Sequence, residues 1–129
     1  MSDLYLIFNH QLTEIQAKAA VTRLKIQRIY SLPDDLKSLW SQVPPDIPEL
    51  AQYLSPVIHW LKIQASPFDY VLIQGDFGAC HILVQEAFRL GLIPIYSTTQ
   101  RRAIEEPGPD GSVRLTHEFK HVMFRKYER

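Results

Sequence analysis

Runs of apolar and β-branched residues predict four strands in the first hundred residues. Leu4–Phe8 is apolar at every position, which suits a strand buried on both faces better than a strand with one exposed face. Ile26–Leu32 combines β-branched and aromatic residues and stops at Pro33. Phe68–Gln74 and Leu92–Thr99 are two further predicted strands, with apolar runs at Tyr70–Ile73 and Leu92–Tyr96. Together these segments predict a sheet with buried central strands.

Helix signals occupy the segments between these strands. Thr13 and Gln16 have the spacing of a capping box, in which each side chain binds the backbone amide of the other residue. Six prolines divide residues 33–67 into short pieces, because proline breaks the interior of a helix. The predicted helices are Thr13–Leu24, Asp34–Gln42, Pro48–Tyr53, Ser55–Gln64 and a fifth that ends at Leu90 before Gly91.

The last part of the sequence predicts a hairpin. Glu106–Gly111 has the composition of a turn, and Ser112–Phe124 suggests a strand that returns beside the one before the turn. The complete order is strand, helix, strand, helices, strand, helix, strand and hairpin. This alternation predicts an α/β fold, with a mainly parallel sheet flanked by helices and an antiparallel C-terminal hairpin.

Length and composition suit one domain, residues 1–129, that buries enough surface to fold without disulfides. The lone Cys80 and the scattered histidines lack the spacing of a zinc site, so we expect no metal and no cofactor. The apolar runs are far shorter than the roughly 20 residues of a membrane span. Asp3 stands near the start, where a signal peptide carries basic residues. We therefore expect a cytoplasmic protein without a membrane partner.

Charge is balanced over the whole chain but not along it. The 14 Lys and Arg residues equal the 14 Asp and Glu residues, yet residues 101–129 carry seven basic side chains against five acidic ones. A protein that binds duplex nucleic acid usually has a basic excess over the whole domain. We therefore expect no duplex nucleic acid as a partner. The basic segment indicates either a small anionic ligand held locally or a solvated hairpin face.

Three of the predicted strands end in polar or glycine-rich residues. Ligands of open parallel sheets collect at the carboxyl ends of the strands, so we expect these ends to form one pocket. The three ends are Asn9-His10, Gln74-Gly75-Asp76-Phe77-Gly78 and Ser97-Thr98-Thr99-Gln100-Arg101.

Each candidate at the first two ends has a chemical role and a plainer alternative. Gly75 and Gly78 would let backbone amides approach a phosphate at a helix start, although the segment matches neither a Walker A loop nor a dinucleotide-binding glycine motif. Asp76 would accept a hydrogen bond from a ribose hydroxyl or an adenine amine, or would only cap the helix. His10 would transfer a proton near neutral pH, or would only hydrogen-bond the following loop.

Candidates for phosphate contacts come from the fourth strand and the hairpin. Thr98, Thr99 and Arg101 offer hydroxyls and a guanidinium fork to phosphate oxygens, or else form a solvated strand edge. Lys120 and His121 are neighbours in a predicted strand, where successive side chains point to opposite faces. Only one of these two is therefore expected to face the site.

Five segments of the sequence belong together as a pattern. They are Asn9-His10 before Leu12-Thr13, Leu39-Trp40-Ser41 before Pro44-Pro45, Tyr70 to Ala79, Gly91 to Thr99, and Phe119 to Val122 followed by Phe124 to Tyr127. On these segments the chain resembles a small family of CRISPR-associated Csx proteins encoded beside type III systems. The resemblance covers nearly the whole chain.

This resemblance implies a fold, a reaction and a partner. The Csx proteins look like relatives of the CARF domain, a Rossmann-like dimer that binds cyclic oligoadenylates. The implied activity is that of a ring nuclease, which opens cyclic tetra-adenylate when a 2′-hydroxyl attacks the neighbouring phosphate, needs no metal, and switches off antiviral signalling. A ring of four identical nucleotides has two-fold symmetry, so a symmetric homodimer is expected.

Under this interpretation, the catalytic candidates are His10, Arg101 and Lys120. The ligand-binding candidates are Asn9, Gln74, Gly75, Asp76, Phe77, Gly78, Thr98 and Thr99. Two other functions stay open. One is a protein that binds cyclic oligoadenylate without cleaving it, and the other is an α/β protein-interaction module unrelated to nucleotides.

Overall fold

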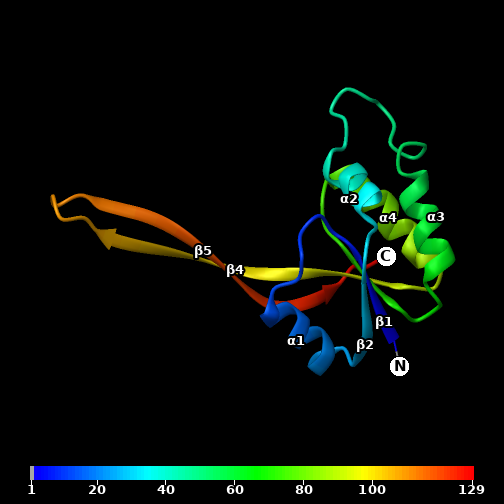
Figure 1. Cartoon of the computed structure of the whole chain (residues 1–129), viewed down its shortest axis with the longest axis horizontal. Helices are drawn as coiled ribbons and strands as arrows, with labels where there is room; N and C mark the ends of the chain where they lie inside the picture. Colours follow the sequence, from blue (N-terminus) through cyan, green and yellow to red (C-terminus); the bar gives the residue numbers. More distant parts are fainter. Residues whose placement is uncertain (1) are drawn as a thin grey trace.

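Residues 2–129 are described by the computed structural model, and within them the chain forms a five-stranded sheet with helices on both faces (Figure 1). β1 pairs in parallel with β2 and β3, β3 pairs in parallel with β4, and β5 runs antiparallel to β4. The predicted α/β fold, with its mainly parallel sheet and antiparallel C-terminal hairpin, is confirmed. In spatial order the strands are β2 (Ile26–Ser31), β1 (Ser2–Ile7), β3 (Tyr70–Ile73), β4 (Ile93–Pro107) and β5 (Val113–Lys126).

Helices of unequal number cover the two faces of the sheet. α1 lies alone on one face, and α2, α3 and α4 cover the other (Figure 1). Thr13 and Gln16 form the predicted capping box, with N–O distances of 3.0 and 3.2 Å, so α1 begins directly after Thr13. The helices in this part of the chain are α1 (Glu14–Arg23), α2 (Asp34–Ser41), α3 (Ser55–Gln64) and α4 (Phe77–Arg89).

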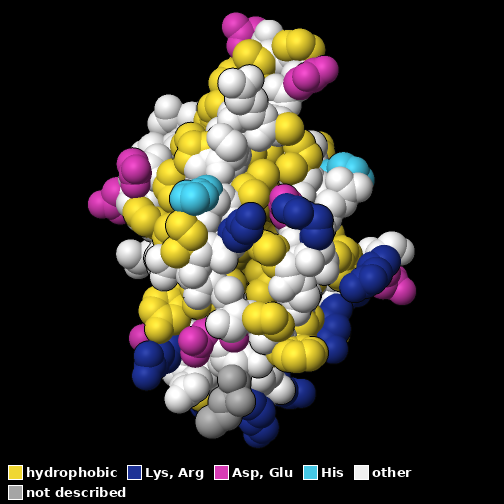
Figure 2. All heavy atoms as spheres, turned by 90° about the vertical axis from the view of Figure 1, so that its right-hand side faces the viewer, with side chains coloured by type: hydrophobic (Ala, Val, Ile, Leu, Met, Phe, Trp, Pro, Cys, Tyr) yellow, Lys and Arg dark blue, Asp and Glu magenta, His cyan; other side chains and the backbone are white. Residues whose placement is uncertain are grey.

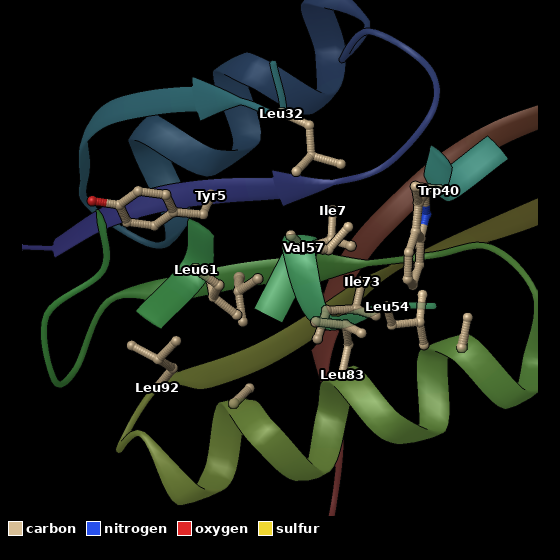
Figure 3. Packing of buried hydrophobic residues seen from close by; sticks show 13 residues of the cluster. Tyr5, Ile7, Leu32, Trp40, Leu54, Val57, Leu61, Ile73, Leu83 and Leu92 are labelled. Atoms are coloured by element: carbon tan, nitrogen blue, oxygen red, sulfur yellow. The ribbon is translucent and has the colours of Figure 1, made fainter. Parts of the chain in front are cut away.

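Alternate side chains of the strands build a separate core on each face of the sheet. On the face with three helices, Tyr5 and Ile7 of β1 share a core with Val57 and Leu61 of α3 and Leu83 of α4 (Figure 3). Burial on both faces explains why the inner residues of β1 and β3 are apolar at every position. The core under α1 consists of Leu4, Leu6, Ala20, Ile26, Leu72, Ile95 and Phe124.

β4 and β5 continue past the rest of the sheet and form a long two-stranded hairpin that projects from the domain (Figure 1). β3 pairs with β4 only up to Ile95, whereas β5 stays paired with β4 up to Pro107. We call residues 100–120 the arm. The sequence predicted that β4 ends at Thr99. β4 instead continues to Pro107, because the residues beyond Thr99 pair with β5 and do not form a loop.

One predicted helix, Pro48–Tyr53, is wrong, because this segment forms turns. The hydroxyl of Tyr53 instead donates to the carbonyl oxygens of Leu39 at 2.5 Å and Gln42 at 3.1 Å. These side-chain bonds tie the segment to the end of α2 without a helix.

Three general findings concern residues 2–129. No helix in this range is long and apolar enough to cross a membrane. The same residues contain no group of three or more His, Cys, Asp or Glu side chains placed to hold a metal ion. At the end of the domain opposite the arm, acidic, basic and apolar side chains are intermingled (Figure 2).

Candidate functional site

The carboxyl ends of β1 and β3 meet beside α2 and enclose a small hollow of about 310 Å³. Asn9, Gly75 and Asp76 line this hollow together with Trp40 and Ser41. Loops diverge at this edge of a parallel sheet, which leaves room for a ligand. The structure thus brings two of the three predicted strand ends together.

The indole of Trp40 fixes the backbone where β3 ends. Its Nε1 donates to the carbonyl oxygen of Gln74 at 2.9 Å, and the side chain is buried. A Cβ at Gly75 would lie 2.8 Å from this nitrogen, so the ring approaches as closely as it does only because the residue is glycine. At Gly78 a Cβ would lie 3.4 Å from Leu50, which is much less crowded. Gly75 therefore has a packing role in addition to its place in the hollow.

Asp76 and Phe77 form the start of α4. Oδ2 of Asp76 accepts a hydrogen bond from the amide of Ala79 at 3.0 Å, so the side chain does cap the helix. Phe77 is 95% exposed and lines a second hollow, of about 530 Å³, with Gln74 and Gly75. An exposed aromatic ring of this kind offers a flat face on which a nucleobase can stack.

A larger hollow, of about 720 Å³, lies between the N-terminus of α1 and the root of the arm. It brings Thr99 and Arg101 of β4 to Lys120 of β5. Antiparallel pairing explains this meeting, because Lys120 lies opposite Gln100, which stands between Thr99 and Arg101. Residues that are about twenty positions apart in the sequence therefore share one site.

The lining of this larger hollow is cationic. The basic residues Arg101, Arg102 and Lys120 line it against the single acidic Glu118, and the register places the side chain of Arg101 on the same face as Thr99. Thr13, at the N-terminus of α1, also lines it, and the N-terminal end of a helix carries a partial positive charge. Ligand sites in proteins span roughly 300–1,000 Å³. The hollow, which we call the cationic hollow, therefore suits an anionic ligand of nucleotide size.

Two contacts hold the side chain of Arg101 in place. Its Nε donates to Nδ1 of His117 at 3.3 Å, and its guanidinium carbon lies 5.9 Å from the centre of the Phe119 ring. These contacts use one nitrogen and one face of the guanidinium group. The two terminal nitrogens form the fork that binds phosphate oxygens in pairs.

A chain of polar contacts beside the cationic hollow was not predicted from the sequence. Oγ of Ser97 lies 2.5 Å from Nδ1 of His121, and Gln16 donates to the same oxygen at 3.4 Å. The amide of Ser97 donates to the side-chain oxygen of Gln74 at 2.7 Å. Burial lowers the pKa of the His121 imidazole below its ordinary value of 6.5. Its Nε2 is shielded from solvent and has no hydrogen-bond partner within residues 2–129.

A β-bulge lies next to His121 in β5. The pairing of β4 with β5 shifts between Thr98 and Thr99, which leaves Val122 as an extra residue in β5. Lys120 and His121 both line the hollow, although the register pairs them with Gln100 and Thr99, on opposite faces of the ribbon. Nothing in the periodicity of the sequence marks the position of this bulge.

Three predicted residues, His10, Gly78 and Thr98, line none of the hollows described above. The hydroxyl of Thr98 exchanges hydrogen bonds with the backbone N and O of Met123, both at 3.2 Å, and so stabilises the bulge. His10 is exposed and its ring lies 5.3 Å from that of Phe8. The expected single pocket is divided into separate hollows, because β4 runs on into the arm instead of ending level with β1 and β3.

Comparison with known proteins places the chain in a family. A family model described as "Uncharacterized protein MJ1673 family" matches residues 2–125. The chain belongs to the MJ1673 family. It is 45% identical over 127 residues to a protein of Methanocaldococcus jannaschii described as "Uncharacterized protein MJ1673", and this match covers 98% of each chain. No solved structure matches the chain. The cationic hollow and the arm lie within the residues that the MJ1673 family model covers.

Proposed function

We propose that this protein is a cytoplasmic prokaryotic ring nuclease, which opens cyclic tetra-adenylate without a metal and so switches off type III CRISPR signalling. The observation that carries the proposal is the cationic hollow, where Thr99, Arg101 and Lys120 gather beside the N-terminus of α1. The resemblance to Csx proteins supplies the identity of the anion. A Rossmann-like, CARF-related domain is the fold that accompanies this activity.

The proposed reaction takes its nucleophile from the substrate. The 2′-hydroxyl of one ribose attacks the neighbouring phosphorus, the bond from phosphorus to the 5′-oxygen breaks, and the hydroxyl proton passes to that oxygen. The products are a 2′,3′-cyclic phosphate and a 5′-hydroxyl. The protein has to align the attacking and leaving oxygens, which contributes several kcal/mol to catalysis, and to stabilise the phosphate charge.

Arg101 and Lys120 are the residues that stabilise this charge. Arg101 is held by His117 and Phe119 before any ligand binds, so little reorganisation is needed when charge develops on the phosphate. Lys120 adds a second cation to the same hollow. His10 remains the candidate for proton transfer, a contribution of about 10²- to 10⁴-fold.

In this proposal, residues at the ends of β1 and β3 bind the adenosine. Phe77 presents an exposed ring for stacking. Asn9 and Asp76 line the small hollow and are placed to bind a ribose hydroxyl or the adenine amine. The backbone at Gly75 and Gly78 contributes further contacts. This division assigns phosphate and base to different hollows of one protein.

The proposal is tested by single-turnover cleavage of labelled cyclic tetra-adenylate, with and without EDTA, and with chromatographic separation of the products. We expect linear products that end in a 2′,3′-cyclic phosphate, at a rate that EDTA does not change. A rate lost on chelation would overturn the metal-independent mechanism. No binding and no cleavage of any cyclic oligoadenylate would overturn the proposed function itself.

Variants in the same assay locate the site. Arg101→Ala and Lys120→Ala should each lower the cleavage rate by about 10²-fold or more, because each removes a cation from the hollow. Arg125→Ala is the matched control, since Arg125 packs on Tyr96 and donates to its hydroxyl at 3.0 Å. His10→Ala and Asp76→Ala test proton transfer and adenosine binding. Equal rates for all of these variants would refute the assigned site.

Sequestration without cleavage is the second candidate function, and one observation favours it. Neither His10 nor Nε2 of His121 is presented to the hollow beside Arg101 within residues 2–129. The cationic residues would then bind the ring without a partner for proton transfer. Tight binding with intact ligand recovered after long incubation would identify this function.

A further inference from the structure

The two faces of the arm differ in chemistry. Cross-strand partners share a face of a two-stranded ribbon. On one face Arg102 lies opposite Glu118 and Glu106 lies opposite Arg114, so opposite charges pair across the strands. The other face, which we call the inner face, presents Val113, Leu115 and Phe119, which are 63%, 57% and 65% exposed, beside Arg101, Glu105 and His117. Ser97 and His121 belong to the inner face and contact each other. Ser97 also accepts a hydrogen bond from Gln16 of α1, so the inner face lies on the same side of the sheet as α1.

The exposed apolar side chains of the inner face favour a partner that covers them. An isolated two-stranded hairpin is marginally stable at best in water, and the arm leaves the sheet as such a hairpin (Figure 1). Exposed contiguous apolar surface in a soluble protein commonly marks an interaction site. The arm itself has four basic and four acidic residues, so it lacks the positive excess with which a β-ribbon binds nucleic acid.

A groove at the root of the arm complements its tip. The groove, of about 450 Å³, lies between α1 and β5 and is lined by apolar residues that include Ile15 and Val122 and by the basic Lys18 and Arg23. The tip, residues 103–113, carries three acidic residues and no basic one. The acidic residues of the tip therefore complement the basic residues of the groove, and both surfaces also include apolar side chains.

We propose that a second copy of this chain covers the inner face, in a two-fold dimer in which each arm lays its tip in the groove of the other subunit. The groove and the tip lie at opposite ends of the same face. A two-fold axis through the middle of that face therefore brings each tip to the other groove, and one contact is made twice.

The length of the arm permits this exchange. Residues 100–107 of β4 span about 27 Å at about 3.4 Å per residue. The radius of gyration of a compact domain of this size is only about 14 Å. The tip therefore lies beyond the reach of its own groove and within reach of a neighbour.

The same axis places the two cationic hollows face to face, because each hollow lies between the groove and the tip. A cyclic tetranucleotide, which is itself two-fold symmetric, fits between two such hollows. This last step rests on the proposed function, whereas the dimer does not.

The test is sedimentation equilibrium of the full chain without ligand, so that its result is independent of ring cleavage. We expect a dimer whose dissociation constant rises roughly tenfold or more in Leu115→Glu, because this places a charge in the apolar contact. Thr116→Glu is the matched control, since Thr116 is the next residue on the opposite face. Both variants should unfold cooperatively with the melting temperature that the wild type has at low, dissociating concentration, which shows that neither has lost its fold.

Charge reversal gives a second and independent readout. Glu105→Lys alone and Lys18→Glu with Arg23→Glu should each weaken association, and the three substitutions together should restore it. A wild-type chain that is monomeric at every concentration, or a dimer indifferent to Leu115→Glu, overturns the proposal. Retention of an RNA probe by such a monomer would assign the inner face to nucleic acid instead.

Discussion

At the residue scale, one glycine and one tryptophan determine the shape of the strand end that carries the candidate site. Trp40 packs against Gly75 and hydrogen-bonds the carbonyl oxygen of Gln74 at 2.9 Å. A buried indole usually needs such a partner for its N–H. The position of the backbone that lines the small hollow therefore depends on a contact that only glycine allows.

Gly75→Ala should destabilise the protein by about 1–3 kcal/mol, because the added Cβ would lie 2.8 Å from Nε1 of Trp40 and the indole would have to move. Urea unfolding followed by tryptophan fluorescence measures the change. Gly78→Ala is the control, because its Cβ meets Leu50 at 3.4 Å and alanine favours the helix that begins there. Equal losses of stability in the two variants would contradict this account of Gly75.

His121 should make stability depend on pH. Burial lowers the pKa of its imidazole in the folded state, so the unfolded chain, with a pKa near the ordinary 6.5, binds the proton more readily. The free energy of unfolding should therefore fall as the pH decreases through about 6.5. In His121→Asn this decrease should be smaller, as measured by urea unfolding at several pH values. His59→Asn, at an exposed position of α3, should keep the wild-type profile.

At the element scale, the sequence predicts elements whose signals are local. The spacing of Thr13 and Gln16 places the start of α1 correctly, and the apolar runs locate the central strands. Pro48–Tyr53 fails because the choice between helix and turns there depends on a bond from Tyr53 to a distant carbonyl group. The extent of β4 depends in the same way on pairing with β5, which no local signal contains.

The candidate site follows the same rule. Asn9 and Asp76 meet because parallel strands end at one edge, which the predicted topology already implies. Thr99, Arg101 and Lys120 meet because of antiparallel register in the hairpin. The contact of His121 with Ser97 depends on the same pairing of β4 with β5. The sequence therefore identifies the candidate side chains and the strand ends that they follow. Which of them share a hollow depends on the register of the strands.

The cap of α1 should support the cationic hollow, because Thr13 and Gln16 line it. Thr13→Ala removes the hydroxyl that accepts from the amide of Gln16 and should cost about 1 kcal/mol of stability. Chemical denaturation measures this loss. Thr22→Ala should cost less, because Thr22 lies inside the same helix, where alanine has the higher helix propensity. A larger loss for Thr22→Ala would exclude this role of the cap.

At the scale of the whole molecule, the domain and the arm have separate roles. The two core clusters of the described chain contain no residue between 96 and 123. The arm therefore adds little to the packing of the domain, while it carries an apolar face and part of the cationic hollow. The proposed dimer would account for its length, which the packing of the two cores does not require.

Shortening the arm should abolish association between subunits and leave the domain folded. Arg102 and Glu118 lie directly opposite each other, so residues 103–117 can be replaced by the two-residue turn Asn-Gly. The shortened chain should still unfold cooperatively, because both cores are intact. In the wild type, the unfolding midpoint should rise with protein concentration, since dimer formation stabilises only the folded state. The midpoint of the shortened chain should be the same at every concentration, and a concentration dependence that survived the deletion would show that the subunits associate through another surface.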